Sequence, residues 1–434
     1  MVKKKKKLSD KQKLRLFFVD DLAESRSAMP VCRHFGDCGG CEFQDVPYER
    51  QLTAKRRAFA FILDAVIEDF RQKAVETEDI EKAEAMRRHA ESLAAELVTV
   101  DVGIVSSPRP LGYRQRMDYV FAFGKAGLRR ANRHRQVVEL EECPLLGDVG
   151  FAVFQKAKRL AGEAGLESYD YMRHHGELRY FVVRRSRNGQ ILLSLVTKTR
   201  DCETAVRSVL ERLAADGDIT SGHWLLADGL GDVSFGAPLA NVGNPWITET
   251  LNGIDLRIGP NTFFQSNPAV AEKAYAAIRD FCPDGALALD MYSGVGSIAL
   301  NLAAKARRVL AVENVPDNTA LSRTNIEATA ADNVTMVDAD STAYLRELAE
   351  SPDAGIPDLL VVNPPRPGVE GDGMSAIKRL GSARFAYLSC NPFTLLRNLA
   401  EILDEYRVRS LTIYDMFPQT RHFESLALLE RRRQ

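Results

Sequence analysis

Short apolar runs alternate with helix-patterned stretches from residue 254 to residue 434, and this alternation constrains the fold more than any other feature. The runs lie in GALALDMY, RRVLAVE, NVTMVDAD, PDLLVVNPP, RFAYLSC and RSLTIYDMF. Strands and helices that alternate in this way form a doubly wound, mostly parallel sheet, whose ligands bind at the carboxyl ends of the strands. We therefore predict an α/β, Rossmann-like domain over residues 254–434, with its functional site at that edge.

A glycine-rich turn follows the first of these strands, in LDMYSGVGSIAL at 289–300. Gly294 and Gly296 allow a tight bend and a close approach of the backbone to a ligand. Glu313 closes the next strand, where a carboxylate can accept hydrogen bonds from both hydroxyls of a ribose. The pattern fits a dinucleotide or S-adenosylmethionine, and such a turn also occurs without a ligand.

The strand LLVV ends in the loop NPPRPG, which begins at Asn363. Two prolines stiffen such a loop and can hold Asn363 toward a planar substrate. Dinucleotide oxidoreductases do not need this loop, so S-adenosylmethionine is the favoured ligand. Asp290, Asp338 and Asp340 also follow strands, where each could contact the ligand or cap the next helix. For Asp338 we expect the cap.

Cys390 closes the fifth strand and is followed by Asn391 and Pro392. A lone cysteine is most often a small buried apolar group. Here the Asn-Pro turn is expected to direct the thiol into the ligand cleft. Glu424 lies in YDMFPQTRHFESLALLER, on the neighbouring strand or its loop. For His422 in the same segment, a structural role is favoured over catalysis.

A thiolate, a methyl donor and a carboxylate base at one edge predict methylation of uracil at C5. Addition of a thiolate to C6 makes C5 nucleophilic, and a base such as Glu424 must then remove the C5 proton so that the thiolate can leave. The target base must also leave its stack to reach these groups.

Three cysteines are clustered in PVCRHFGDCGGCEFQ, and a fourth follows in EECPLLGD. Three clustered thiolates and one distant thiolate favour an iron–sulfur cluster. Zinc also accepts four thiolates, and a loop without metal is the remaining alternative. The predicted ligands are Cys32, Cys38, Cys41 and Cys143.

The remainder of the chain divides into a basic arm at 1–28 and a central α+β domain at 29–253. The central domain is helical at about 48–98 and β-rich from about 100, with a helix near 150–165. The net charge of −1 indicates no polyanionic partner, but the basic run GKAGLRRANRHRQ could contact phosphates through Arg130, Arg133 and Arg135. No apolar stretch has the length of a membrane span and no secretory h-region follows Lys3–Lys7, so we expect a cytoplasmic protein without membrane association.

Several segments together resemble the iron–sulfur-containing RNA uridine-C5 methyltransferase family, whose members make 5-methyluridine in tRNA or large-subunit rRNA. They are PNTFFQSNPAVAEKAY, LDMYSGVGSIALNLA, VENVPDN, SCNPFTLLRNL and DMFPQTRHFESLALLER, within a match over residues 30–434. The resemblance implies that Cys390 is the nucleophile, that Glu424 is the proton acceptor, and that the cysteine loop holds a 4Fe–4S cluster. It implies methyl-donor or uracil contacts for Gln265, Tyr292, Ser297, Glu313, Asp340 and Asn363.

Some positions depart from the family pattern. Asn363 stands where the family usually has Asp, Asn398 stands where an acidic residue is frequent, and Ser293 and Ser297 replace more usual residues. The helical stretch at 65–98 is interpreted as an insertion. An N-terminal oligonucleotide-binding barrel is not evident, so the central domain and the basic arm are expected to hold the RNA.

Two alternatives to a uridine-C5 methyltransferase remain at this point. The sequence NPPR resembles the loop of amino-group methyltransferases, with Asn363 as the acceptor of the amine's hydrogen bond, but that function leaves Cys390 and Glu424 unused. An RNA-binding protein without catalysis is the second alternative. A monomer is expected in each case.

Overall fold

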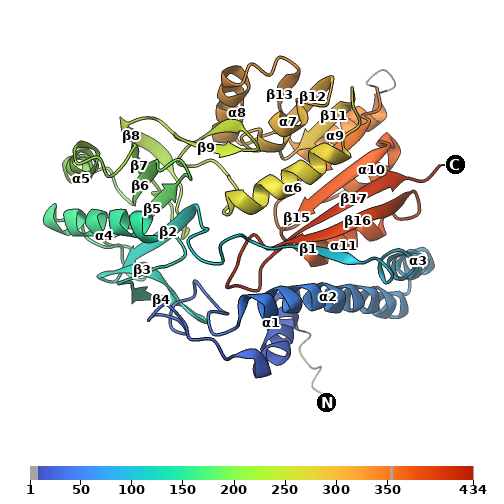
Figure 1. The fold of residues 1–434 in the computed structure, drawn as a ribbon, viewed down its shortest axis with the longest axis horizontal. Helices are drawn as coiled ribbons and strands as arrows, with labels where there is room; N and C mark the ends of the chain where they lie inside the picture. Colours follow the sequence, from blue (N-terminus) through green and yellow to red (C-terminus); the bar gives the residue numbers. More distant parts are fainter. Residues whose placement is uncertain (1–7, 352–354, 434) are drawn as a thin grey trace.

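The computed structural model describes residues 8–351 and 355–433, so the predicted basic run Lys3–Lys7 lies outside the described residues. Two large sheets dominate the molecule (Figure 1). The eight-stranded sheet on the right of the view has the order β1-β16-β17-β15-β14-β11-β12-β13, and the seven-stranded sheet on the left has the order β4-β3-β2-β5-β6-β7-β8. The chain thus combines an α/β part with a β-rich part, as the sequence predicts.

The eight-stranded sheet is mostly parallel. Strands β11 to β15 pair in parallel, and β17 runs antiparallel between β15 and β16. The predicted Rossmann-like sheet is therefore confirmed. Its strands are β1 Val102–Val105, β11 Leu287–Met291, β12 Arg308–Glu313, β13 Val334–Asp338, β14 Leu359–Val362, β15 Arg384–Ser389, β16 Tyr406–Tyr414 and β17 Glu424–Arg431.

Helices cover both faces of this sheet, which explains why its central strand β14 is apolar at every position. In β14, Leu360 and Val362 belong to one core and Leu359 and Val361 to the other, and all four are fully buried. The helices that connect the strands are α6 Pro268–Phe281, α7 Ser297–Leu302, α8 Pro316–Ala328, α9 Ser341–Glu350, α10 Gly373–Leu380 and α11 Pro392–Ala400.

The N-terminal helices pack on the eight-stranded sheet and not on the β-rich part. Phe59, Ile62 and Val66 share a core with Leu396 and Leu399 of α11, and Figure 1 shows the blue helices α2 and α3 beside the red strands. These helices are α1 Asp10–Asp21, a 3-10 turn Ala23–Ser25, α2 Tyr48–Glu76 and α3 Ile80–Leu97.

Strand β1 extends the same sheet, because it pairs in parallel with β16. The stretch predicted as an insertion at 65–98 thus lies in α2 and α3 and covers the C-terminal sheet. The predicted boundary at 253/254 separated residues 48–105 from the sheet on which they pack. Periodicity identifies the apolar face of a helix, but it does not identify the surface that covers it.

The seven-stranded sheet is antiparallel except for the parallel pair β6 and β7. Helices α4 Asp148–Glu163 and α5 Glu203–Ala215 bury their apolar faces in its core, and α4 matches the helix predicted near 150–165. The strands are β2 Arg116–Ala122, β3 Lys125–Arg130, β4 Arg133–Glu139, β5 Leu178–Arg185, β6 Ile191–Thr197, β7 Ser221–Leu226 and β8 Ala237–Gly243.

A short hairpin, β9 Ile247–Leu251 and β10 Ile254–Ile258, links the two sheets. No helix within residues 8–351 and 355–433 combines the length and the apolar content that crossing a membrane requires.

Candidate active site

The predicted site residues gather at the carboxyl edge of the eight-stranded sheet. Tyr292 follows β11, Glu313 ends β12, Asn363 follows β14 and Cys390 follows β15. Glu424 begins the antiparallel strand β17 and therefore lies at the same edge. The parallel order of the strands thus brings together residues that are more than a hundred positions apart in the sequence.

Cys390 and Glu424 lie at the same end of two adjacent strands. Ser389, which precedes Cys390, pairs with Ser425, which follows Glu424, and this is the terminal pair of the antiparallel ladder. Glu424 is only 3% exposed, and burial raises its pKa to about 8. Burial and, after it, the charge of Glu424 raise the pKa of the half-buried Cys390 thiol to about 11. Each group therefore favours its neutral form in the free protein.

Arg366 lies beside both of these groups and counteracts the two shifts. Its charge lowers the pKa of Cys390 and of Glu424. The Arg366 carbonyl accepts hydrogen bonds from Asn391 Nδ2 at 3.1 Å and from Thr394 Oγ1 at 3.2 Å. The proline loop is thereby tied to the turn that follows the thiol.

The sequence prediction assigned no function to Arg366, although a cation directly after two prolines at a strand end was a usable signal.

The arrangement of Cys390, Glu424 and Arg366 can do three things chemically. A thiol can add to an electrophilic carbon, a carboxylate of raised pKa can accept a proton near neutral pH, and a cation can stabilise the charge that develops between them.

The glycine-rich turn shapes the adjacent part of the edge. Gly294 and Gly296 have φ angles of +58° and +84°, and a Cβ on Gly296 would lie 2.8 Å from Ser322 Oγ. Tyr292 also has a positive φ of +58°, which is strained for a residue with a side chain. Glu313 Oε2 accepts a hydrogen bond of 3.0 Å from the Gly294 amide. The carboxylate is thus held against the turn.

The aspartates at this edge cap helices or pair with arginine. Asp340 caps α9 by accepting a 2.9 Å hydrogen bond from the Ala343 amide. The expectation that Asp338 is the cap is wrong, because the capping residue of α9 lies two residues later and Asp338 instead pairs with Arg323 at 2.5 Å. Asp290 is fully buried and accepts from the Ala299 amide at 2.9 Å, and burial raises its pKa to about 8.

The remaining predicted residues flank the turn. Gln265 precedes α6 and is buried, Ser297 is the buried first residue of α7, and Asn363 is half-buried with its amide 3.4 Å from the Met291 carbonyl. Phe263 was not predicted. It is 59% exposed, and its carbonyl lies 4.0 Å from the Cβ position of Gly294. An exposed aromatic ring at this turn can stack on a planar base, and the pair Phe-Phe before Gln265 was the available signal.

The cysteine loop precedes α2 and packs beside the β-rich part. Cys143 is buried in the core of the seven-stranded sheet, and Cys38 and Cys41 pack against that core. Among the residues that the structure describes, no group of three or more Cys, His, Asp or Glu side chains is arranged to hold a metal ion. Ligation of a cluster or of zinc by these cysteines therefore stays a prediction. Burial raises the pKa of Cys38 and Cys41 to about 12, so both thiols favour the neutral form.

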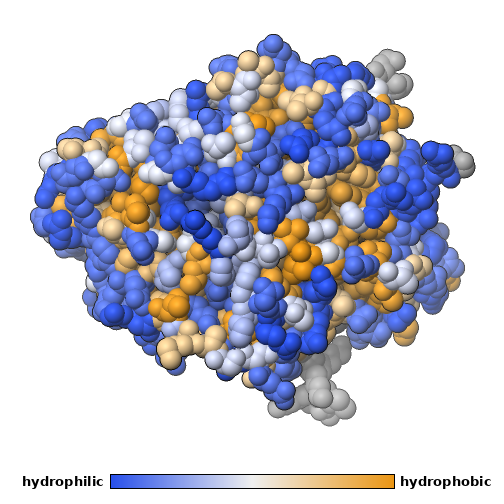
Figure 2. All heavy atoms as spheres, viewed as in Figure 1, coloured by the Kyte–Doolittle hydropathy of each residue, from blue (hydrophilic) through white to orange (hydrophobic). Residues whose placement is uncertain are grey.

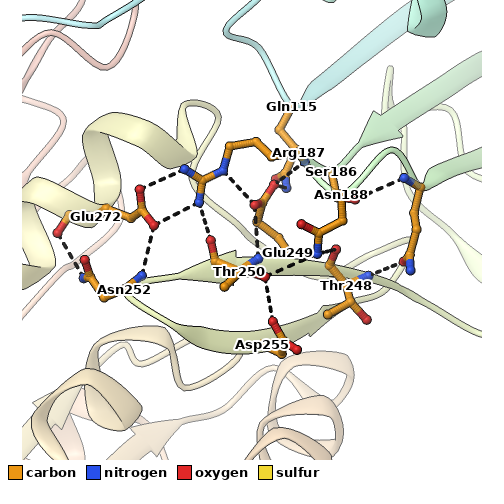
Figure 3. A network of polar contacts seen from close by, with 11 residues as sticks. Gln115, Ser186, Arg187, Asn188, Thr248, Glu249, Thr250, Asn252, Asp255 and Glu272 are labelled. Carbon is orange, nitrogen blue, oxygen red and sulfur yellow. Dashed lines mark hydrogen bonds and ion pairs between the residues drawn. The ribbon is translucent and has the colours of Figure 1, made fainter.

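A polar network joins the β-rich part to the site (Figure 3). Arg187, in the turn between β5 and β6, donates from Nε to Glu249 at 2.8 Å and from Nη1 to Glu272 of α6 at 2.8 Å. Glu272 accepts from the Asn252 amide at 3.0 Å, and Asn252 Nδ2 donates to Asn301 of α7 at 2.8 Å. The central sheet is thus connected through side chains to the helix that follows the glycine turn.

Comparisons with known proteins match this architecture. Residues 244–432 match the tRNA (Uracil-5-)-methyltransferase family model. An uncharacterised RNA methyltransferase of Caldanaerobacter subterraneus is 30% identical over 416 residues, which cover 92% of this chain and 84% of that protein. The tRNA (uracil(54)-C(5))-methyltransferase of Pyrococcus horikoshii is 27% identical over 399 residues, which cover 92% of this chain and 85% of that enzyme.

A solved structure shares the fold over nearly the whole chain. The crystal structure of Pyrococcus abyssi tRNA (uracil-54, C5)-methyltransferase in complex with S-adenosyl-L-homocysteine matches with a TM-score of 0.72 and 25% identity, over 90% of this chain and 86% of that one. The fold, the family model and the full-length relatives agree. The chain therefore belongs to the RNA (uracil-5-)-methyltransferase family and is an S-adenosylmethionine-dependent enzyme.

Proposed function

We propose that this enzyme methylates C5 of a uridine in tRNA through a covalent bond between Cys390 Sγ and C6 of the uracil. The observation that carries this proposal is that Cys390 and Glu424 both adjoin the terminal Ser389–Ser425 pair of β15 and β17, and that the charge of Arg366 acts on both. The amino-group alternative built on Asn363 is set aside, because the uracil-5-methyltransferase match at 244–432 includes that loop.

In the proposed reaction Cys390 acts at C6, Glu424 acts on the C5 proton, and Arg366 acts through its charge. Cys390 loses its proton and adds to C6, and the electrons of the C5–C6 double bond move toward the C4 carbonyl, which makes C5 nucleophilic. After C5 has taken the methyl group, Glu424 removes the C5 proton. The double bond then reforms and the Sγ–C6 bond breaks, which regenerates the thiolate. Arg366 favours the thiolate and the ionised carboxylate, because its charge lowers both pKa values.

The methyl donor fits the glycine turn. Bound S-adenosylmethionine supplies an electrophilic methyl group. The residues that would hold it are those at the turn and the neighbouring strand ends, where Glu313 offers a carboxylate to ribose hydroxyls and the positive φ angles of Gly294 and Gly296 allow the tight bend of the backbone. The proposed contacts of methyl donor or uracil are Gln265, Tyr292, Ser297, Glu313, Asp340 and Asn363, to which we add Phe263.

A tRNA is the proposed substrate because the Pyrococcus relatives are named for uridine 54 of tRNA. Ribosomal RNA is the competing substrate. The two are separated by offering both RNA classes to the enzyme and mapping the methylated position.

The four cysteines stay the proposed ligands of a 4Fe–4S cluster, with zinc as the alternative. Two buried polar atoms, Gln44 Nε2 and Tyr119 Oη, have no hydrogen-bond partner in the described part of the chain, and these two side chains lower the pKa of Cys41 and Cys143 respectively. Donors directed at sulfur are typical of ligating thiolates. Iron, sulfide and zinc contents of protein purified without oxygen test this, and Cys38→Ser should lower the metal content whereas Cys202→Ser should not.

The central experiment uses RNA that contains 5-fluorouridine, with S-adenosylmethionine, followed by a denaturing gel. Fluorine at C5 cannot leave as a proton does, so wild-type enzyme should form a covalent protein–RNA band that Cys390→Ala lacks. Cys282→Ala is the matched control, because Cys282 is buried away from the site against α6. A wild-type enzyme that methylates uridine without ever forming this band would contradict the thiol mechanism.

A further inference from the structure

A large cleft lies beside the active site. It has a volume of about 1060 Å³, and α1, the cysteine loop and strands β2 and β3 form its walls. Ser266, the neighbour of Gln265, and Arg421, three residues before Glu424, also line it. The cleft therefore extends from the outside of the molecule toward the proposed target uridine.

The cleft carries an excess of positive charge. Eight Lys and Arg side chains line it, against four Asp and Glu side chains. Several of these arginines are neutralised, for example Arg116 by Asp118 at 2.6 Å and Arg129 by Asp232 at 2.6 Å. Within the described part of the chain, the lining cations without an ion-pair partner are Lys11, Arg15 and Arg114.

Two of these free cations come from one face of α1. Lys11 and Arg15 are four residues apart, so their side chains are neighbours on the helix, and both are exposed. The helix is fixed in place, because Phe18 is buried in the core and Asp10 pairs with Arg397 of α11 at 2.7 Å. Burial and, more weakly, charges that include Lys11 lower the pKa of His422 to about 3. Lys11 is therefore within electrostatic reach of the segment that leads to Glu424.

The cleft also presents aromatic rings. Phe235 lines it and is 57% exposed, and the half-buried Phe35 lines it from the cysteine loop. The face of the molecule in Figure 2 is mostly hydrophilic, with apolar patches interspersed. Free cations beside exposed aromatic rings are the combination that binds single-stranded nucleic acid, because phosphates contact the cations and bases stack on the rings.

We propose that α1 forms one wall of a cleft that holds the single-stranded RNA next to the target uridine, with Lys11 and Arg15 on phosphates and Phe235 stacked on a base. This inference rests on the proposed function. The segment predicted as a basic arm, residues 1–28, contains α1, and the inference gives α1 a part in substrate binding.

The test measures RNA affinity and its salt dependence by filter binding, together with KM and kcat for the RNA. K11Q and R15Q should each weaken RNA binding about fivefold and reduce the slope of log affinity against log salt by about 0.7, the value for one phosphate contact on a single strand. F235A should weaken binding about tenfold with little change in that slope. The affinity for S-adenosylmethionine should be unchanged in all three.

The matched controls are a lysine of the same helix and an apolar residue of the loop that holds Phe235, and neither lines the cleft. K13Q removes a charge from α1 on the side that faces Leu16 and Phe61, and L230A truncates an exposed apolar residue near Phe235. Both should bind RNA as the wild type does. If K11Q, R15Q and F235A also match an active wild type, the inference is wrong and the proposed function stands. If the wild type gives no adduct with 5-fluorouridine RNA yet these variants lose affinity as described, the cleft is supported and the proposed reaction fails.

Discussion

Cys390 and Glu424 lie at the same end of the β15–β17 ladder, because they adjoin its terminal Ser389–Ser425 pair. This register brings the proposed nucleophile and the proposed proton acceptor to one end of two hydrogen-bonded strands, although 33 residues separate them in the chain. Rigid strands hold such a pair more accurately than loops do. Each group also influences the other, because the charge of Glu424 raises the pKa of Cys390.

Replacement of Glu424 by Gln should stop the reaction after methyl transfer. The amide cannot accept the C5 proton, so the Cys390–C6 bond should persist, and turnover should fall about 10²- to 10⁴-fold. A denaturing gel with ordinary uridine RNA should then show a covalent band that carries the methyl group. Cys390→Ala in the same background should abolish that band, and rapid turnover by Glu424→Gln would exclude Glu424 as the base.

Removal of the Arg366 charge should raise the pH at which the methylation rate increases. Glu424 must be deprotonated to act, so the wild-type rate should rise as the pH rises through about 8. Arg366 lowers the pKa of Glu424 and of Cys390, so both values increase when Arg366 is replaced by Met and the rise should occur at higher pH. Arg366→Lys retains a charge and should shift less. Identical profiles for all three proteins would show that Arg366 does not act on these groups.

Replacement of Gly296 by Ala should weaken binding of S-adenosylmethionine. The added Cβ would lie 2.8 Å from Ser322 Oγ at a φ of +84°, so the turn must shift. We expect at least a tenfold loss of affinity in calorimetric titration, since about 1.4 kcal/mol corresponds to a factor of ten. Gly285→Ala is the matched control, because its φ is +70° and no atom lies within 4 Å of its Cβ position. Equal loss in both variants would indicate a general effect of strain.

Replacement of Lys55 by Met should destabilise the fold strongly. Lys55 and Asp415 are fully buried and pair at 2.5 Å, and Tyr48 Oη also donates to Asp415 at 2.8 Å. Loss of the lysine leaves a buried charge without its cation, which costs about 3–5 kcal/mol. Denaturant unfolding should show this cost, and Lys55→Met combined with Asp415→Asn should recover part of it. A double variant as unstable as the sum of the single variants would show that the pair is not coupled.

Local sequence patterns were sufficient to predict much of the fold and of the candidate site. The alternation after residue 254 predicted β11 to β16 in order, and turn chemistry after strands predicted that Cys390, Glu313 and Asn363 share an edge. The sequence prediction failed at Asp338, because a strand end and a helix start three residues apart cannot be separated by pattern alone. It also missed Arg366 and Phe263, whose neighbours are distant in the chain.

The sequence by itself determined the strand order along the chain, the glycine turn and the reactive residue types, because these depend on local backbone preferences and on side-chain chemistry. Only the tertiary structure decided that α2 and α3 cover the C-terminal sheet, that β1 joins it, and that α1 lines a cleft with the cysteine loop. The first two of these contacts join segments hundreds of residues apart. Burial of apolar faces drives them, and since burial has no direction, a periodic pattern cannot specify which surface will be its partner.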